Sequence, residues 1–166
     1  AYVVFGGRAG SAATLADIVG GTGGFVINGD NFGDATGFSV SGAGDVNADG
    51  LADLIVGSHY TVNGTGYVLY GKTSTSAIDL TNVGSQGFAI NGVTTNDFNG
   101  YSVSSAGDVN GDGLSDLMVG AYGNDGIASD AGRTYIVYGK TPTTAVSLSS
   151  VTSGTSTAGF VINGNG

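Results

Sequence analysis

The sequence predicts an all-β fold, and its composition is the first reason. Gly accounts for 33 of the 166 residues, only 10% of the residues are charged, and all 13 acidic residues are Asp. Because helices favour Glu and Lys over Gly and Asp, long helices are not expected. The apolar fraction of 40% is rich in Val, Ile, Tyr and Phe, which suits strands and is too high for a disordered glycine-rich chain.

Internal repeats are the second reason. A Y-x-x-x-G motif and an F-x-I-N-G motif each occur three times, beginning at Tyr2, Tyr67 and Tyr135 and at Phe25, Phe88 and Phe160. Successive Y-x-x-x-G motifs are 65 and 68 residues apart, and successive F-x-I-N-G motifs are 63 and 72 apart. A period of this length corresponds to one supersecondary unit, which is too small to bury its own faces and has to stack on a neighbour.

Each complete unit contains four predicted strands. They are 38–41, 54–57, 67–70 and 88–91 in one unit, and 101–104, 117–120, 135–138 and 160–163 in the next. The second and third strands are continuous apolar runs, which indicates a sheet that is covered on both faces. Four short strands bounded by Gly and repeated along the chain are typical of propeller blades. The connectors between third and fourth strands carry sparse apolar residues, which suits one helical turn or a packed loop.

The order of the motifs predicts about two and a half antiparallel blades in tandem, in a partial β-propeller or an open array. Residues 1–29 form a half repeat with only the third and fourth strands, and two repeats follow at 30–92 and 93–166. An orphan half-sheet leaves an unpaired edge, which folded proteins pair or cover. The first residue is Ala, so we expect a processed product or a piece of a longer array. We also expect other repeats, or further copies joined head to tail, as partners.

One stretch recurs with nearly the same sequence, as GDVNADGLADLIVG over 44–57 and GDVNGDGLSDLMVG over 107–120. Oxygen side chains at positions 1, 3, 5 and 9, a carbonyl at position 7 and Gly at position 6 suit a hard cation such as Ca²⁺ in a tight loop. The sequence therefore predicts two Ca²⁺ sites, one per complete repeat. Their ligands are Asp45, Asn47, Asp49, Leu51 and Asp53, and Asp108, Asn110, Asp112, Leu114 and Asp116.

Two other interpretations of this loop fit the sequence less well. A single D-x-N-x-D-G stretch is also a common polar turn, but two copies with all four oxygen side chains in the same places favour a metal. An EF-hand is excluded because it needs Glu at position 12, where this chain has Val56 and Val119 inside an apolar run. The predicted site is of the strand–loop–strand kind.

Both blocks resemble FG-GAP repeats, which form the β-propeller of integrin α-subunits and occur as arrays in bacterial, notably cyanobacterial, surface proteins. The resemblance rests on SGAGDVNADGLADLIVG and SSAGDVNGDGLSDLMVG, with YVVFG and GFVING as later strands. It implies Ca²⁺ binding by the alternating Asp and Asn side chains, an extracellular or cell-surface location and a role in adhesion. The sequence departs from the eponymous residues, with Thr36-Gly37 and Asn99-Gly100 in place of Phe-Gly. An integrin propeller has seven blades, and two and a half units cannot close such a ring.

Charge and residue usage exclude several classes of function. The net charge of −9, with only four basic residues, argues against nucleic acid as a partner. Two bound Ca²⁺ would bring that charge to about −5. Cys is absent, so neither disulfides nor thiolate metal sites can form, and no apolar run is long enough to insert into a membrane. His59 is the only His, Glu is absent, and no catalytic set is recognisable, so we expect no enzyme activity.

The leading hypothesis is a calcium-binding scaffold or adhesion segment of a secreted or cell-surface protein. The alternative is a carbohydrate-binding module that uses Tyr60 and Tyr122, which lie in the most variable connectors. A third possibility is an accessory segment of a larger extracellular hydrolase. Asp34 and Asp97 recur at the 63-residue spacing, which predicts a structural role in the turn before the first strand, and Asn63 is a formal glycosylation acceptor.

Overall fold

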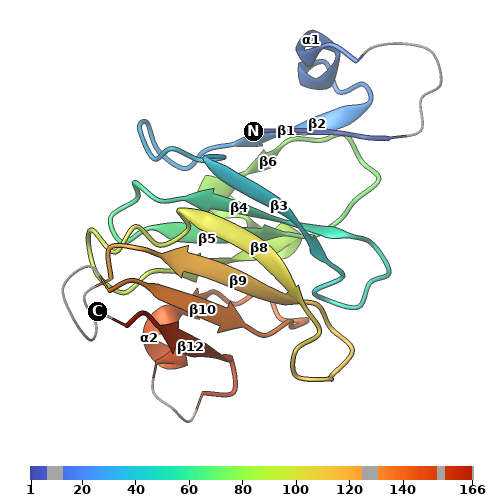
Figure 1. Cartoon of the computed structure of the whole chain (residues 1–166). Helices are drawn as coiled ribbons and strands as arrows, with labels where there is room; N and C mark the ends of the chain where they lie inside the picture. The colour runs from blue at the N-terminus through green and yellow to red at the C-terminus, as the bar shows by residue number, and fades with distance from the viewer. Residues whose placement is uncertain (7–12, 125–130, 153–155, 166) are drawn as a thin grey trace.

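The structure, a computed structural model, describes residues 1–6, 13–124, 131–152 and 156–165. The described residues form three sheets that follow one another along the chain and stack face to face (Figure 1). The predicted all-β class is confirmed, and the arrangement is that of consecutive blades in a partial propeller. Parts of the connectors near 7–12, 125–130 and 153–155 lie outside the described residues.

Both complete blades are antiparallel meanders. The middle sheet pairs β3 (Ser39–Gly44), β4 (Asp53–Ser58), β5 (Thr65–Leu69) and β7 (Gly87–Asn91) in that order. The last sheet pairs its strands in the same way: β8 (Ser102–Gly107), β9 (Asp116–Ala121), β10 (Arg133–Val137) and β12 (Gly159–Asn163). The predicted second, third and fourth strands agree within two residues. The first strands run three residues further than predicted, because a bulge at Gly42/Gly44 and at Ser105/Gly107 interrupts the side-chain alternation.

The N-terminal sheet contains the predicted half repeat. Its strands β1 (Tyr2–Val4) and β2 (Gly24–Asn28) pair antiparallel, and α1 (Leu15–Val19) lies between them in the chain. Thr14 caps α1, since its hydroxyl accepts the N–H of Asp17 while the Asp17 carboxylate accepts the N–H of Thr14. Within the described residues β1 has a single strand neighbour, whereas β5 and β10 each have two.

Two short strands were not predicted, and they join each blade to the one before it. β6 (Ile78–Asp79) pairs in parallel with β2, and β11 (Val146–Ser147) pairs in parallel with β7. Short helical turns, one of the two structures that the connectors allowed, follow directly: η1 (Leu80–Asn82), η2 (Gly84–Gln86) and α2 (Leu148–Val151). The connectors of the two complete repeats therefore each add a strand to the preceding sheet, which gives the middle sheet five strands instead of four.

Apolar side chains fill the spaces between the sheets. Phe25 and Ile27 of the first sheet pack with Tyr67 and Leu69 of the middle sheet. On the opposite face of β5, Val68 packs with the last sheet. The middle sheet is thus covered on both faces, as its continuous apolar strands predicted. No helix among the described residues has the length and apolar character needed to cross a bilayer.

Glycine permits the close approach of the two complete blades. A Cβ atom at Gly57 would lie 2.0 Å from the carbonyl oxygen of Gly100, which accepts the hydroxyl of Ser39 at 2.8 Å. Real Cβ atoms do not come that near to a backbone oxygen. The β4 backbone can therefore reach the next blade only without a side chain at this position.

Candidate metal centre

The predicted cation loops connect β3 to β4 and β8 to β9, at the same end of the stacked sheets (Figure 1). Position 6 makes the sharp turn, with φ of 85° at Gly50 and 89° at Gly113. Position 4 is also left-handed, with φ of 62° at Ala48 and 78° at Gly111. Two left-handed residues within three positions curl the backbone around the polar side chains.

The side chains at positions 1, 3 and 5 turn inward. The N–H of Asp49 donates to Oδ1 of Asp45 at 3.2 Å and to Oδ1 of Asn47 at 2.9 Å. Nδ2 of Asn47 donates to Oδ2 of Asp49 at 2.9 Å, and the N–H of Gly50 donates to Oδ2 of Asp45 at 3.0 Å. The oxygens of three side chains are thereby gathered in one small loop. The second loop repeats each of these contacts among Asp108, Asn110, Asp112 and Gly113.

Position 9 differs from the others because its carboxylate is fully buried. Asp53 accepts the N–H of Val46 at 2.8 Å and that of Gly71 at 2.7 Å, one on each oxygen. Burial raises the pKa of Asp53; the two N–H bonds oppose this, and the nearby charges of Asp49 and Asp45 add to the increase. Asp116 holds Val109 and Gly139 in the same way. In both loops the position 9 carboxylate therefore connects the loop to the segment that follows the third strand of the blade.

The first loop also contacts the next blade. The carbonyl of Asp45 accepts the N–H of Ser115 at 2.9 Å, and the carbonyl of Val46 accepts the N–H of Lys140 at 2.9 Å. A Cβ atom at Gly44 would lie 2.2 Å from the hydroxyl oxygen of Ser115, so the two segments are in close contact. The shape of the first loop is consequently coupled to the packing of two blades.

Taken alone, the acidic side chains do not converge on a point. Across the described ranges, no three His, Cys, Asp or Glu side chains lie close enough together to hold an ion. The reason is visible in each loop, where position 3 is Asn and the position 9 carboxylate faces backbone N–H groups. The inward-facing groups that could bind a metal are two carboxylates and one amide. Their oxygen atoms are the kind of ligand that Ca²⁺ prefers. The repulsion between the Asp side chains is also of the kind that a cation would relieve.

Asp34 and Asp97 have the structural role that their spacing predicted. Asp34 is buried, and its carboxylate accepts the N–H groups of Asp30, Asn31 and Thr36 at 2.8–2.9 Å. Burial alone would raise the pKa of Asp34, but these hydrogen bonds outweigh burial and lower it. Asp97 is also buried and accepts Nδ2 of Asn124 at 2.6 Å.

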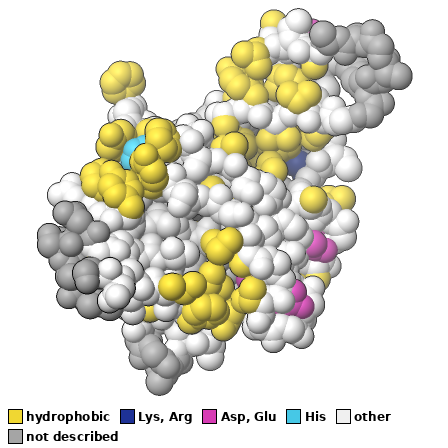
Figure 2. Space-filling model, viewed as in Figure 1, with side chains coloured by type: hydrophobic (Ala, Val, Ile, Leu, Met, Phe, Trp, Pro, Cys, Tyr) yellow, Lys and Arg dark blue, Asp and Glu magenta, His cyan; other side chains and the backbone are white. Residues whose placement is uncertain are grey.

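At the opposite end of β4, aromatic rings surround His59. This aromatic cluster, seen around the cyan His in Figure 2, consists of Phe38, His59, Tyr60, Phe98, Tyr101 and Tyr122. His59 lies in a loop as predicted, but it is only 4% exposed and its Nδ1 atom has no hydrogen-bond partner. Burial lowers its pKa, so the imidazole is neutral at pH 7.

Two rings of this cluster were predicted as candidate contacts from the sequence, and three others were not. Tyr60 and Tyr122 were found because their connectors vary, whereas Phe38 and Tyr101 were assigned only to strand starts. Phe38 and Tyr101 recur at the 63-residue spacing, and equivalent positions of stacked blades lie side by side. This recurrence could have predicted that the two rings are in contact. Phe98 has no aromatic counterpart, because Ala35 occupies the same position in the other repeat.

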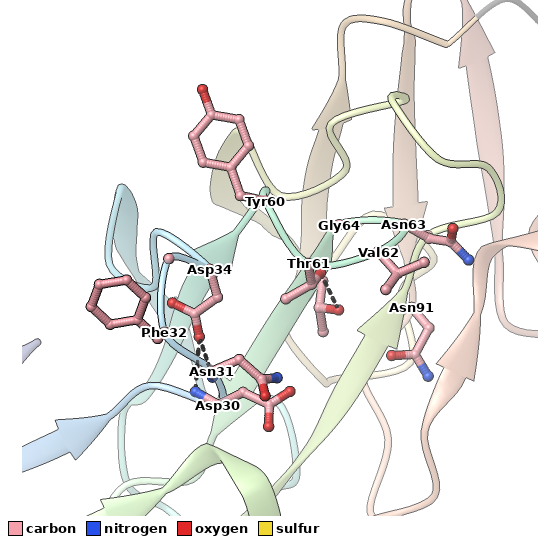
Figure 3. Close-up of a pocket in the computed structure, with 13 residues that line it drawn as sticks. Asp30, Asn31, Phe32, Asp34, Tyr60, Thr61, Val62, Asn63, Gly64 and Asn91 are labelled. Atoms are coloured by element: carbon pink, nitrogen blue, oxygen red, sulfur yellow. Dashed lines mark hydrogen bonds between the residues drawn. The ribbon is translucent and has the colours of Figure 1, made fainter.

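A pocket of about 520 Å³, lined by both polar and apolar side chains, adjoins this end of the molecule (Figure 3). Asp30 and Asn31 line one side and Asn91 lines another, while the rings of Phe32 and Tyr60 stand outward at its margin. The hydroxyl of Tyr67 donates to Oδ2 of Asp30 at 3.3 Å. The volume of the pocket falls within the range of small-molecule binding sites.

Comparison with known families finds FG-GAP repeats at residues 36–69 and 93–137. The matched segments contain β3, β4 and β5 in one case and β8, β9 and β10 in the other, each with its cation loop. No curated protein has a significant match to the sequence.

Proposed function

Because the chain carries two FG-GAP repeats, we propose that it is a calcium-binding β-repeat module of a secreted or cell-surface protein. FG-GAP repeats are modules of integrin-like, extracellular proteins and are generally not enzymes. The proposed role is accordingly structural, as a scaffold or adhesion segment whose blades are stiffened by Ca²⁺. The observation that carries the proposal is the matched geometry of the two loops.

The proposed ligands are the side chains of positions 1, 3 and 5 and the carbonyl of position 7. In the first loop these are Asp45, Asn47, Asp49 and Leu51. Asp53 would join them through lone pairs that its two N–H bonds leave free. The second loop offers Asp108, Asn110, Asp112, Leu114 and Asp116 in the same positions. When bound, the ion supplies positive charge where carboxylates otherwise repel one another.

The mechanical consequence follows from the contacts of the first loop. Its carbonyl groups at Asp45 and Val46 hold Ser115 and Lys140 of the next blade. A loop fixed in one conformation keeps those carbonyls in place, so cation binding and blade packing support each other. Each ion would thus stiffen the junction between strands and, at the first loop, the junction between blades.

Calorimetric titration with Ca²⁺ tests the proposal. We expect two ions per chain for the wild type, one for Asp49→Ala, one for Asp112→Ala and none for the double variant. Asp79→Ala is the matched control, because Asp79 is an exposed Asp that caps a short helix outside the loops. Retention of two ions by the double variant, or loss of an ion in the control, would refute the loop assignment.

The aromatic cluster and the adjoining pocket support a second function, the binding of carbohydrate. Exposed aromatic rings beside Asp and Asn side chains can pack on a sugar ring and hydrogen-bond its hydroxyls. Tyr60 and Tyr122 are 64% and 53% exposed, and Phe98 stacks on Tyr122 at 4.9 Å between ring centroids. A glycan array distinguishes the two functions: binding that Tyr60→Ala and Tyr122→Ala each abolish supports a lectin-like module. A blank array leaves the scaffold role alone.

A further inference from the structure

The two cation loops differ at position 4, beside the Asn of position 3. Position 4 is Ala48 in the first loop and Gly111 in the second. The backbone nitrogen of a residue that follows Asn can attack the carbon of the Asn amide and expel ammonia, a reaction called deamidation. Gly favours this attack, because no Cβ atom blocks the approach of its nitrogen. Asn110 is therefore a candidate modification site.

In the second loop each atom that the reaction uses has a suitable partner. The attacking nitrogen is that of Gly111, whose N–H donates to Oδ1 of Asp108 at 2.7 Å, and a carboxylate at this distance can take the proton that the nitrogen loses. Oδ1 of Asn110, which gains negative charge in the attack, accepts the N–H of Asp112 at 2.9 Å. Nδ2 of Asn110, the leaving nitrogen, donates to Oδ2 of Asp112 at 2.8 Å.

The turn of the loop also holds the two reacting groups together. A hydrogen bond from Oδ1 of Asn110 to the N–H two residues further on is an Asx turn, which folds the side chain back along the Gly111 peptide group. A reaction within one chain is favoured when the nucleophile is held close to the carbon that it attacks. The loop therefore supplies proximity as well as a proton acceptor.

The first loop has only part of this arrangement. Asn47 makes the same two contacts with Asp49. Among the described residues, however, the N–H of Ala48 has no hydrogen-bond acceptor. Position 4 is open in both loops, since Ala48 is exposed although the next blade adjoins the first loop. The proton acceptor and the unshielded nitrogen therefore distinguish the second loop from the first.

Four other Asn-Gly pairs of the chain are held in a different way. In each of them the Gly N–H donates to a backbone carbonyl, which cannot take up its proton. A Cβ atom placed at these glycines would lie 1.7–2.6 Å from a backbone oxygen, whereas no atom lies within 4 Å of one placed at Gly111. The chain is thus packed around these four pairs and open around Gly111. Their Asn residues are Asn63, Asn91, Asn99 and Asn163.

We propose that Asn110 deamidates spontaneously in the folded chain, with Gly111 as the nucleophile and Asp108 as the proton acceptor. The nitrogen of Gly111 forms a bond to Cγ of Asn110, and the bond from Cγ to Nδ2 breaks. The proton of the Gly111 N–H passes by way of Asp108 to Nδ2, which departs as ammonia and leaves a cyclic imide. Water then opens the imide at either of its two carbonyl carbons. The products at this position are Asp and isoaspartate.

Deamidation changes the second loop and leaves the first loop as it is. Nδ2 of Asn110 now donates to Asp112, whereas a carboxylate in its place would repel Asp112. Isoaspartate also adds a methylene group to the backbone, so the Asx turn no longer closes in the same way. The reaction itself needs no ion. Only its effect on cation binding, which makes the two loops unequal as the protein ages, rests on the proposed function.

Peptide mapping of the folded chain, kept in a chelator at mildly alkaline pH, tests the proposal. Asp and isoaspartate should accumulate at Asn110 with release of ammonia, while the Asn residues of the four packed pairs stay amides. The same incubation in urea is the control, because unfolding removes the contacts that distinguish the pairs, and all of them should then react. An Asn110 that stays intact in the folded chain, or that reacts no faster than the four packed pairs, would overturn the proposal. Since no calcium is present, this result does not depend on the calcium proposal.

Matched variants at position 4 test the role of Gly111. Gly111→Ala should reduce the rate at Asn110 to that of Asn47. Ala48→Gly should raise the rate at Asn47, but not to that of Asn110, because the first loop lacks the contact with a carboxylate. Unchanged rates in both variants would show that the nitrogen of position 4 is not the nucleophile.

Asp108→Asn tests the proton acceptor. The amide of the variant keeps the size of the carboxylate and can still accept a hydrogen bond, but it cannot take up the proton. Deamidation at Asn110 should therefore slow although Gly111 is still present. A rate equal to that of the wild type would contradict the role of Asp108.

Discussion

At the scale of single residues, the two cation loops differ at one strained backbone position. Ala48 has a left-handed φ of 62° where the other loop has Gly111 at 78°. A side chain in this region costs about 1–2 kcal/mol, while the extra freedom of Gly in the unfolded chain costs about 0.5–1 kcal/mol. We expect Ala48→Gly to stabilise the fold by about 0.5 kcal/mol and Gly111→Ala to destabilise it similarly.

Urea unfolding in the presence of a chelator measures both variants without a contribution from metal affinity. No atom lies within 4 Å of a Cβ placed at Gly111, so packing does not confuse the comparison. Shifts of the same sign in the two variants would contradict the backbone explanation.

Tyr67 gives the fold a dependence on alkaline pH. Its burial, the charge of Asp30 and their hydrogen bond raise the pKa of Tyr67 to about 12. Because the folded pKa lies above the unfolded value near 10, this stabilisation is complete below pH 10 and is lost as the pH rises through 12. The loss is on the order of 2 kcal/mol.

The free energy of unfolding, followed from pH 9 to 12, should therefore fall more steeply for the wild type than for Tyr67→Phe. Subtracting the two profiles removes the contribution of the other tyrosines. Parallel profiles would show that Tyr67 ionises as readily in the folded chain as in the unfolded one.

At the scale of elements, Gly57 and Gly66 form a matched pair. They face each other in the β4–β5 pairing, but a Cβ at Gly57 would lie 2.0 Å from a backbone oxygen, whereas one at Gly66 would have its nearest neighbour at 3.8 Å. We expect Gly57→Ala to destabilise the fold by about 1–3 kcal/mol, because the neighbouring backbone cannot move aside. Gly66→Ala should change stability by less than about 1 kcal/mol. Chemical denaturation measures the free energy of unfolding of both variants. Equal losses of stability would show that close contact between the blades is not the reason that position 57 requires Gly.

The elements also show what the sequence could predict. The strands were predicted because their apolar runs and bounding glycines recur at a nearly fixed period. A strand boundary placed wrongly in one repeat was therefore visible by comparison with the same position of the other repeat. β6 and β11 were missed because two residues carry no periodicity, and their pairing depends on a blade that precedes them by some fifty residues. The cation ligands were chosen from their oxygen side chains, their spacing and their recurrence in two copies. Spacing cannot reveal that Asp53 faces Val46 and Gly71, because Gly71 lies beyond the following strand.

At the scale of the whole molecule, the two candidate sites occupy opposite ends of β4. Asp53 begins this strand in the cation loop, and His59 follows its last residue within the aromatic cluster. Substitutions in the rings should therefore leave calcium binding intact, and loss of calcium should weaken the stack of blades as a unit. The stacked sheets make this coupling global, because the middle sheet packs against both of the others.

Thermal unfolding with and without Ca²⁺ tests the central claim most directly. An ion present at 100 times its Kd adds about 2.7 kcal/mol to the free energy of unfolding for each site. Two sites should raise Tm by roughly 10–20 °C for a chain of this length. The wild type should show this increase over a chelated sample, and the variant with both Asp49→Ala and Asp112→Ala should show none. An equal increase in the variant, or no increase in the wild type, would contradict a calcium-stabilised repeat.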